Sequence, residues 1–399
     1  MFFQKALLRI KKVPLFLAVL VIAGLLNFYY VLSYGVDVPH RTEWDSLFMF
    51  SPQGSVFQQD QAGRPVLTHM ISYIFYLLGG WNIKIHLLFN YFVYVADIVL
   101  LYRLIVKAAG EYRFLPLFFL PFFSDLNALN LMQATALQFH LTVLFGLIAA
   151  DIGFCRPPTL KNSLRFILFG ALSVLSMNII FMLGLLIGWG IMEAGRKNIP
   201  RIIGMFLFMI MIFHICCGGL SFFTGDQIFR FAVILFSAVL TGLDTVTPLH
   251  LIFILPPAVA LGWGFYQRRL WKDSNAMMLI AIILAVFFSA MNCDSETDPY
   301  FFIHNGAGIV LFAVPVVFTL LRLVKPAFVY LCCLSVIGYS ASFSPRYFQL
   351  EFSARRQVLS CAREYYNKTG DGNCPFISEN NSAAFLDLAK QLNLSFTRH

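Results

Sequence analysis

The sequence predicts an all-α, polytopic membrane protein with about 11 transmembrane helices. Of its 399 residues, 59% are hydrophobic and only 12% are charged, and the mean hydropathy is +0.75. Soluble domains carry about a quarter of charged residues. The apolar stretches are continuous, as in "FLFMIMIFHICCGGLSFF", whereas a transmembrane β-barrel needs short alternating strands. The chain is therefore expected to be helical and surrounded by lipid.

The first apolar stretch follows four basic residues, as a signal peptide would. It is longer than the apolar core of a signal peptide and no small-residue cleavage site follows, so we expect an uncleaved span. The stretch 114–123 is too short to cross alone, and 164–193 is interrupted at "LSMN". Interrupted helices need protein or water around their freed backbone groups. The expected spans are 13–34, 82–106, 114–123, 136–152, 164–177, 178–193, 201–220, 249–266, 276–292, 305–321 and 326–343.

The basic residues predict which loops face the cytoplasm. Eighteen of the 29 Lys and Arg residues lie at the N-terminus and in five alternate loops, which hold four of the 20 acidic residues. The positive-inside rule makes these segments cytoplasmic. Two apolar stretches, 65–79 and 228–243, are expected to lie as helices at the outer surface. If they crossed the membrane, the basic loops would no longer all fall on the cytoplasmic side. The net charge of +9 is thus a topology signal and gives little support for binding nucleic acid.

The apolar pattern stops near Ser344 and divides the chain in two. Residues 1–343 are predicted to form the transmembrane domain, with residues 35–81 as its first external loop. Residues 344–399 form an external helical tail that is too small to be a catalytic domain.

The tail pattern predicts a long amphipathic helix at 346–367 and a second helix at 381–394. Cys361 and Cys374 are the tail's only cysteines. In an oxidising compartment they would form a disulfide; two free thiols are the alternative.

The most distinctive polar cluster, "HRTEWDSL", follows the first span at once. The topology places Glu43 and Asp45 outside, and Trp44 between them suits a membrane interface. A solvated loop with an aromatic anchor is the ordinary interpretation. Against it, the loop is long, its end carries Arg64, and a surface segment follows instead of a span.

Further polar residues gather on the same predicted face. A site is favoured where polar groups converge, which here is the external side. Mixed charges suit a reaction in which a carboxylate takes a proton from a hydroxyl while Arg or His neutralises a departing phosphate. The candidates for binding substrate are Arg64, Gln138, His140, Arg230 and His304.

Nucleotide and metal signatures are absent from the sequence. It has no G-x-x-x-x-G-K-[ST], G-x-G-x-x-G, H-E-x-x-H or C-x-x-C motif. This argues against direct use of ATP or a nucleotide sugar on the cytoplasmic side. We expect no cofactor and no metal site, although a divalent ion between Asp45 and a phosphate stays open.

Asp97 is the clearest ionisable residue inside a predicted span. Such residues are costly and raise a functional hypothesis by default. The structural alternative is that Asp97 pairs with Arg103 or reaches the inner interface. His214 is expected to be a hydrogen-bonding residue between helices.

The arrangement resembles the GT-C class of integral-membrane glycosyltransferases, in which acidic residues lie in the first external loop. "TEWDSLF" followed by "QAGRPVLTHMISYIFYLLGGWNIKIHLLFNYFV" is similar to a bacterial family of this class. "FFSDLNALNLMQATALQFHLTVLFGLIA", "ALSVLSMNIIFMLGLLIG" and the tail ending "AAFLDLAKQLNLSF" are also similar. "DQAGR" replaces the family's "NEHR", so only Arg64 carries over from that motif.

The resemblance implies a sugar donor linked to polyprenyl phosphate and a glycan acceptor. The chain's size is similar to that of serotype-modifying O-antigen glucosyltransferases of the bacterial inner membrane, with a cytoplasmic N-terminus and a periplasmic C-terminus. Asp45, or Glu43, would be the general base. Arg64, with Arg230 or His304, would stabilise the departing phosphate. The alternatives are a flippase or transporter of lipid-linked sugar, and an O-antigen polymerase.

Overall fold

The structure is a computed structural model, and every secondary-structure element that it describes is helical. Its helices are α1 (Phe2–Tyr34), α3 (Val66–Gly79), α4 (Ile83–Ala109), α5 (Ala128–Met132), α6 (Leu137–Cys155), α7 (Leu160–Ser176), α8 (Ile180–Gly195), α12 (Ser274–Met291), α16 (Arg346–Tyr366) and α17 (Ser382–Gln391), with 3₁₀ segments η2 (Leu115–Phe123) and η4 (Ala134–Ala136). The described residues are 2–39, 43–44, 65–80, 82–109, 115–124, 127–177, 180–195, 199–200, 202–207, 272–291, 345–367, 369, 374, 382–392, 394 and 397.

Seven of the eleven predicted spans coincide with described elements, namely α1, α4, η2, α6, α7, α8 and α12. Three helical segments within the described ranges are long and apolar enough to cross a membrane: Leu17–Tyr34, Ile83–Ala108 and Ala134–Cys155. The all-α class is therefore confirmed for the described residues, and the three long apolar helices suggest association with a membrane. The other four spans and the stretch 228–243 lie wholly or mostly outside the described residues, so the count of eleven stays a prediction.

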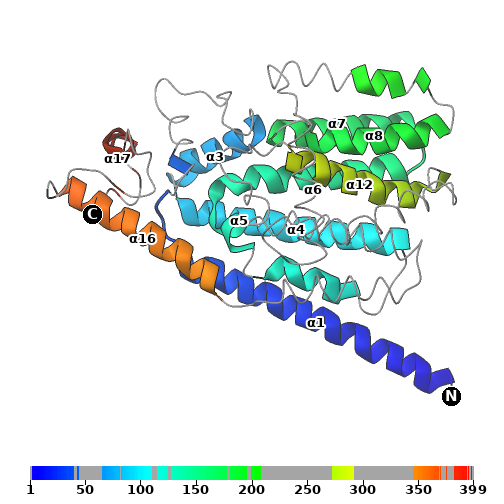
Figure 1. The fold of residues 1–399 in the computed structure, drawn as a ribbon, viewed down its shortest axis with the longest axis horizontal. Helices are drawn as coiled ribbons and strands as arrows, with labels where there is room; N and C mark the ends of the chain where they lie inside the picture. Colours follow the sequence, from blue (N-terminus) through cyan, green and yellow to red (C-terminus); the bar gives the residue numbers. More distant parts are fainter. Residues whose placement is uncertain are drawn as a thin grey trace, which may run out of the picture.

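The long helices run side by side in one bundle (Figure 1). Helix α6 packs against α4, α7, α8 and α12, while α1 lies along the edge against α4 and η2. Helices α16 and α17 lie at the end of the bundle opposite the N-terminus (Figure 1). We call this end, with α5, α16, α17 and the last turn of α1, the tail end.

Ion pairs join the ends of α4 and α6 away from the tail end. Asp151 binds Lys107 at 2.8 Å and Arg156 at 3.1 Å. Both cations belong to loops that the charge pattern assigns to the cytoplasm. The structure therefore separates these basic loops from the tail, as that topology requires; which end faces the cytoplasm stays a prediction.

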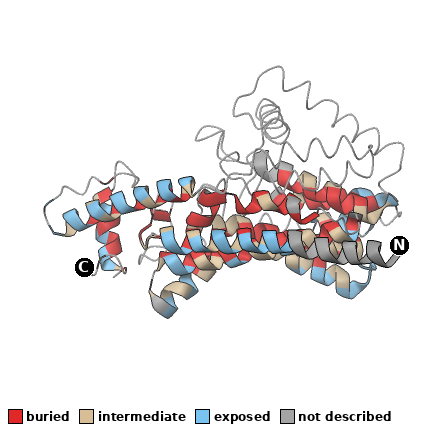
Figure 2. Ribbon diagram, turned by 90° about the horizontal axis from the view of Figure 1, so that it is seen from below, coloured by how far each residue is buried: buried red, intermediate tan, exposed pale blue. Residues whose placement is uncertain are grey.

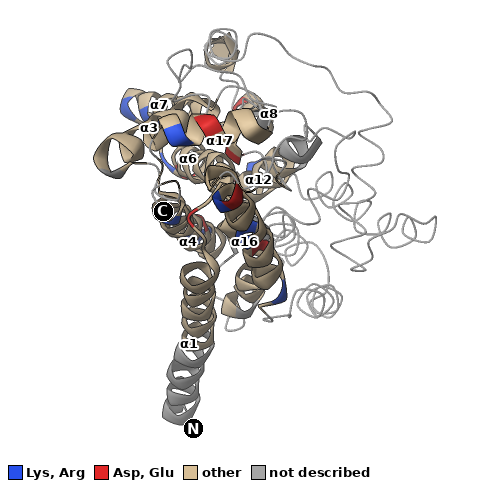
Figure 3. Cartoon of the chain, turned by 90° about the vertical axis from the view of Figure 1, so that its left-hand side faces the viewer, with Lys and Arg blue, Asp and Glu red and all other residues tan. Residues whose placement is uncertain are grey.

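Helix α1 exposes apolar side chains along much of its described length (Figure 2). Ile22 and Leu25 are 64% and 63% exposed. Residues 17–34 of this helix include no Lys, Arg, Asp or Glu, and the coloured part of its ribbon carries neither charge colour (Figure 3). Water would penalise such a surface, whereas lipid tails solvate it without cost.

Helix α3 confirms the helix expected at 65–79 and packs against α7, α6 and α4. The hydroxyl of Thr68 donates to the carbonyl oxygen of Ser176, next to the break between α7 and α8. That break lies at Met177, within the interruption "LSMN" that the sequence indicates. Whether α3 lies at a membrane surface stays a prediction.

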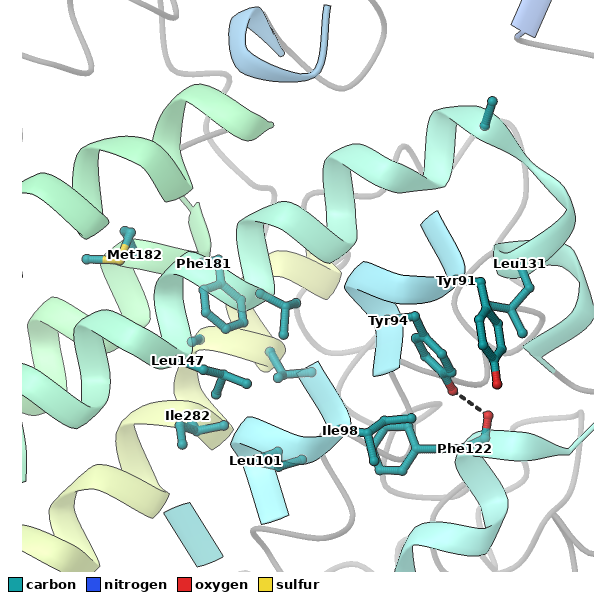
Figure 4. Close-up of a cluster of buried hydrophobic side chains, with 14 of the residues drawn as sticks. Tyr91, Tyr94, Ile98, Leu101, Phe122, Leu131, Leu147, Phe181, Met182 and Ile282 are labelled. Atoms are coloured by element: carbon teal, nitrogen blue, oxygen red, sulfur yellow. Dashed lines mark hydrogen bonds between the residues drawn. The ribbon is translucent and has the colours of Figure 1, made fainter. Parts of the chain in front are cut away.

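The buried core occupies the space between α4, α6, α8 and α12. Figure 4 shows Leu147, Phe181 and Ile282 from three of these helices in one cluster, with the aromatic residues Tyr94 and Phe122 beside it.

Small residues bring α8 and α12 into close contact. Gly184 and Gly188 are four residues apart on α8 and face Ala285 and Ala281 of α12. A Cβ atom at Gly184 would lie 2.4 Å from the Cα atom of Ala285, which is closer than two carbon atoms can approach. In lipid, such small-residue faces drive helix association by close packing.

We expect Gly184→Val to separate α8 from α12, because the clash is with backbone and cannot be relieved by a rotamer change. The cost is about 1–3 kcal/mol or more. Thermal unfolding in detergent should show a lower midpoint for Gly184→Val. Gly204→Val is the matched control, because a Cβ at Gly204 meets nothing within 4 Å. Equal midpoints for the two variants would contradict this packing.

Candidate functional site

The short segment η2 ends inside the bundle, and its freed carbonyl groups are covered by polar side chains. Tyr94 donates to the carbonyl oxygen of Phe122, and Asn27 of α1 donates to that of Phe123 at 3.3 Å. Asn127 donates to the carbonyl oxygens of Pro121 and Phe122 at 2.9 and 3.0 Å. This satisfies the condition for an interrupted helix in a membrane.

A second interruption lies at Gln133, whose extended backbone separates α5 from η4 and α6, and it is held in the same way. We call residues 130–134, with this break, the α5–α6 junction. Asn90 of α4 donates to the carbonyl oxygen of Asn130 at 2.7 Å and to that of Gln133 at 3.3 Å. Two charged residues from distant parts of the chain complete the junction: Glu43 accepts from the Ala134 amide, and Arg355 donates to the Met132 carbonyl oxygen.

Glu43 and Arg355 also bind each other, and both side chains are fully buried. The guanidinium donates from Nη1 to Oε2 at 2.9 Å and from Nη2 to Oε1 at 3.0 Å. Nη1 donates in addition to the carbonyl oxygen of Val38, just beyond α1. We call this ion pair with its three backbone partners the Glu43–Arg355 joint.

The joint connects three parts of the tail end: Val38 and Glu43, the α5–α6 junction, and helix α16. A buried ion pair is stable only when further hydrogen bonds replace the lost water. The two carboxylate oxygens accept three hydrogen bonds here, and the guanidinium donates four. The joint therefore holds the side chain of Glu43 against the α5–α6 junction and helix α16.

The tail forms its own compact structure around this joint. Cys361 and Cys374 form a disulfide, with their Cα atoms 5.6 Å apart. Helix α17 packs against α16 through the Tyr366 hydroxyl, which donates to the carbonyl oxygen of Leu386 at 2.9 Å. Burial raises the pKa of Tyr366. The predicted helices and the disulfide of the tail are thus confirmed.

Trp44 is buried beside the joint and meets the second tail helix. Its ring lies 6.2 Å from that of Phe385, in an edge-on arrangement. Residues 43 and 44 are therefore held by α16 and α17 respectively. Asp45, the next residue, lies outside the described residues.

A separate polar pair lies in the bundle interior. The Nδ1 atom of His140 lies 3.5 Å from Oδ2 of Asp97, and both side chains are buried. Tyr94 contacts His140, with ring centroids 5.0 Å apart. Within the described part of the chain, neither the Asp97 oxygens nor the His140 nitrogens have a hydrogen-bond partner. Asp97 thus faces α6 and not Arg103, which is exposed.

The structure brings few of the predicted site residues together. Glu43 is part of the joint, whereas His140 is fully buried in the bundle beside Asp97. The side chain of Gln138 is half-buried one turn before Thr142, whose hydroxyl binds the Gln138 carbonyl oxygen. Asp45, Arg64, Arg230 and His304 all lie outside the described residues.

Arg355 is the residue that the sequence reasoning missed. Its helical spacing in the sequence could have revealed it. Arg355 lies on the buried face of α16, together with Phe348, Glu351, Val358 and Ala362. A charged residue on the apolar face of an amphipathic helix indicates a buried partner.

The comparisons with known proteins add no relative. No protein-family model matches this chain, and no curated protein and no solved structure shows significant similarity to it.

We expect Arg355→Met to lower the free energy of unfolding by about 3–5 kcal/mol, because it leaves a buried carboxylate without its counter-charge. The double variant Glu43→Gln/Arg355→Met should lose less than the sum of the single variants, since the amide needs no counter-charge. Chemical unfolding in detergent measures all three free energies.

Arg356→Met is the control for this cycle. Arg356 follows Arg355 on α16 and is exposed, with its guanidinium 5.2 Å from the Phe352 ring centroid. Its loss should cost less than about 1 kcal/mol. Additive free energies across the cycle would show that Glu43 and Arg355 are not coupled.

Proposed function

We propose that this protein is an integral-membrane, inverting glycosyltransferase. It would move a sugar, with glucose as the first candidate, from a polyprenyl-phosphate carrier to a surface polysaccharide or O-antigen acceptor. The observation that carries this proposal is the Glu43–Arg355 joint. It holds the Glu43 side chain at the tail end, where Trp44 contacts Phe385, and Asp45 is the next residue in the sequence.

The contacts of Glu43 favour Asp45 as the general base. Both carboxylate oxygens of Glu43 are already engaged and the side chain is fully buried, so an acceptor hydroxyl has no access to it. Asp45 lies two residues further along. We therefore assign the base to Asp45 and a positioning role to Glu43.

In the proposed reaction, Asp45 takes the proton of the acceptor hydroxyl as its oxygen attacks the anomeric carbon. The bond from that carbon to the phosphate oxygen breaks, and polyprenyl phosphate leaves with the electron pair. Arg64, with Arg230 or His304, would stabilise the charge that develops on the phosphate. No nucleotide and no metal is required by this scheme.

The tail supports a location at the periplasmic face of the bacterial inner membrane. Disulfides persist in oxidising compartments and are rare in the cytosol. The Cys361–Cys374 bridge therefore favours a periplasmic tail end, and the Lys107, Asp151 and Arg156 cluster would then face the cytoplasm.

Asp45→Asn should reduce transfer about 10²–10⁴-fold, because it removes the base and keeps the size of the side chain. The measurement is transfer of labelled sugar from the polyprenyl carrier to acceptor glycan by detergent-solubilised protein. Glycan analysis of host polysaccharide, with and without the chain, tests the same point in cells. Asp60→Asn, in the same loop, should transfer at the wild-type rate. Undiminished transfer by Asp45→Asn would refute the assignment.

The Asp97–His140 pair favours a second candidate function, transport of the lipid-linked sugar. Transporters place ionisable residues in the bundle interior, where a proton can be bound and released. Asp97 and His140 are buried there and lie 3.5 Å apart.

Asp97→Asn separates the two functions. A glycosyltransferase should keep most of its transfer activity in detergent, because Asp97 is not part of the proposed chemistry. A transporter should lose translocation of labelled lipid-linked sugar in vesicles and show no transfer with either chain. The Asp97→Asn variant and the wild-type protein must be compared at equal amounts of folded protein. Addition of a glycan chain in place of one sugar would identify a polymerase.

A further inference from the structure

The first turns of helix α7 carry exposed cations next to exposed leucines. Lys161 and Arg165 are four residues apart and are therefore neighbours on one face of the helix. Leu160, Leu164 and Leu168 repeat at the same spacing on the adjoining stripe and are 77%, 57% and 54% exposed. The buried residues of α7 lie on its opposite side, where the helix packs mainly against α6. We call these five exposed residues the α7 patch.

The charge of the α7 patch is not balanced by the protein. Neither Lys161 nor Arg165 has a carboxylate partner within the described part of the chain. Asp151 is the nearest acidic residue along the chain, and it is already bound by Lys107 and Arg156. Two like charges at a spacing of four residues repel each other. An anion from outside the chain would relieve that repulsion.

Arg156 adds a third cation, which the local fold holds in place. Its guanidinium donates from Nε and Nη2 to Oδ2 of Asp151 at 3.3 and 3.1 Å. The side-chain amide of Asn162 donates to the carbonyl oxygen of Pro157 at 2.9 Å, and its backbone amide donates to the Thr159 hydroxyl at 3.3 Å. The short connection between α6 and α7 is thus fixed to the first turn of α7. Arg156 therefore lies at the start of the same helix.

The position of Arg165 distinguishes the α7 patch from an ordinary basic loop. Arg165 lies about 7.5 Å along the helix axis from Leu160, the first residue of α7. A cation in a loop is surrounded by water, whereas the helix sets Arg165 beside the exposed Leu164 and Leu168. A guanidinium next to lipid tails needs an anion within hydrogen-bond reach, and a phosphate accepts two hydrogen bonds from it.

We propose that the α7 patch binds an anionic glycerophospholipid. Lys161 and Arg165, together with Arg156, would bind the phosphate group, and an acyl chain would lie along the three leucines. Basic surfaces at the ends of membrane helices bind anionic lipid head groups in this way. A free phosphate or an acidic peptide would use the cations alone and leave the leucines without a partner.

This lipid site is independent of the proposed glycosyl transfer. It lies where α6 connects to α7, at the end of the bundle away from the tail end, and none of its residues takes part in the proposed chemistry. The predicted topology makes this end cytoplasmic, and anionic lipids give the cytoplasmic leaflet its negative surface potential. Loss of lipid binding and loss of sugar transfer are therefore separate outcomes.

Native mass spectrometry of the full chain in a neutral detergent tests the site. Titration with phosphatidylglycerol and with phosphatidylcholine, both with the same acyl chains, gives an affinity for each lipid. These two lipids differ in net charge, and only phosphatidylglycerol is anionic. We expect the wild-type protein to bind one phosphatidylglycerol at least about tenfold more tightly than phosphatidylcholine.

Removing two cations of the α7 patch should abolish this preference. A basic residue at an anionic surface contributes about fivefold in affinity, so Lys161→Gln/Arg165→Gln should bind phosphatidylglycerol about 10–30-fold more weakly. Its binding of phosphatidylcholine should not change. Arg346→Gln/Arg356→Gln is the matched control, because it removes two exposed cations from α16 at the tail end. The control should bind phosphatidylglycerol as the wild-type protein does.

Four results would overturn the inference. The first is equal affinity of the wild-type protein for the two lipids, a measurement that requires no variant to fold. The second is binding of phosphatidylglycerol by Lys161→Gln/Arg165→Gln that is no weaker than binding by its control. The third is displacement of the lipid by an equal concentration of inorganic phosphate, which would indicate an anion site without a role for the acyl chain. The fourth is tighter binding of polyprenyl phosphate than of phosphatidylglycerol, which would make the α7 patch a site for the sugar carrier.

Discussion

The hydrogen-bonding requirement of the backbone in lipid governs this structure. Unbroken helices satisfy their own amide and carbonyl groups, but each interruption leaves several without partners. The chain is interrupted after η2 and again at the α5–α6 junction. Both interruptions lie against buried polar side chains: Asn27, Tyr94 and Asn127 at the first, and Asn90, Glu43 and Arg355 at the second. The polar interior of the bundle follows largely from this need.

The Glu43–Arg355 joint meets that need with charged groups instead of neutral ones. Neutral amides such as Asn90 are sufficient to cover carbonyl groups, so a charged pair is not required for backbone hydrogen bonds alone. Charge makes the contact specific, because neither partner can leave without exposing the other to a large desolvation penalty. A specific connection between the first loop and the tail is what a site assembled from both would need.

Much of the framework could be predicted from the sequence, because it depends on local signals. Continuous apolar stretches located seven helical elements as spans and α3 as a surface helix, and the amphipathic pattern located α16 and α17. The interruption at "LSMN" and the disulfide could also be predicted, because a break in an apolar stretch and a nearby pair of cysteines are both visible within a short part of the sequence. The glycine pair of α8 lies in the printed sequence as "GLLIG" and predicts close packing, although its partner on α12 does not follow from it.

The partners inside the site could not be predicted in this way. Glu43 and Arg355 are 312 residues apart, and Asp97 meets His140 on another helix. Composition and periodicity place each residue on one face of its own helix. They do not say which other helix packs against that face. Arg103 was the nearest cation to Asp97 along the chain, yet it lies on the exposed side of α4. Only packing of the whole bundle decides between such partners.

The position of Arg355 late in the chain has a consequence for biosynthesis. The ribosome makes Glu43 first and needs roughly 15–60 s, at about 5–20 residues per second, to reach its partner. Throughout that interval Glu43 of the nascent protein lacks Arg355 as its counter-ion, and the α5–α6 junction lacks the hydrogen bond from Arg355. A message truncated before codon 355 would leave every copy in that condition, exposed to the proteases that clear unfinished membrane proteins.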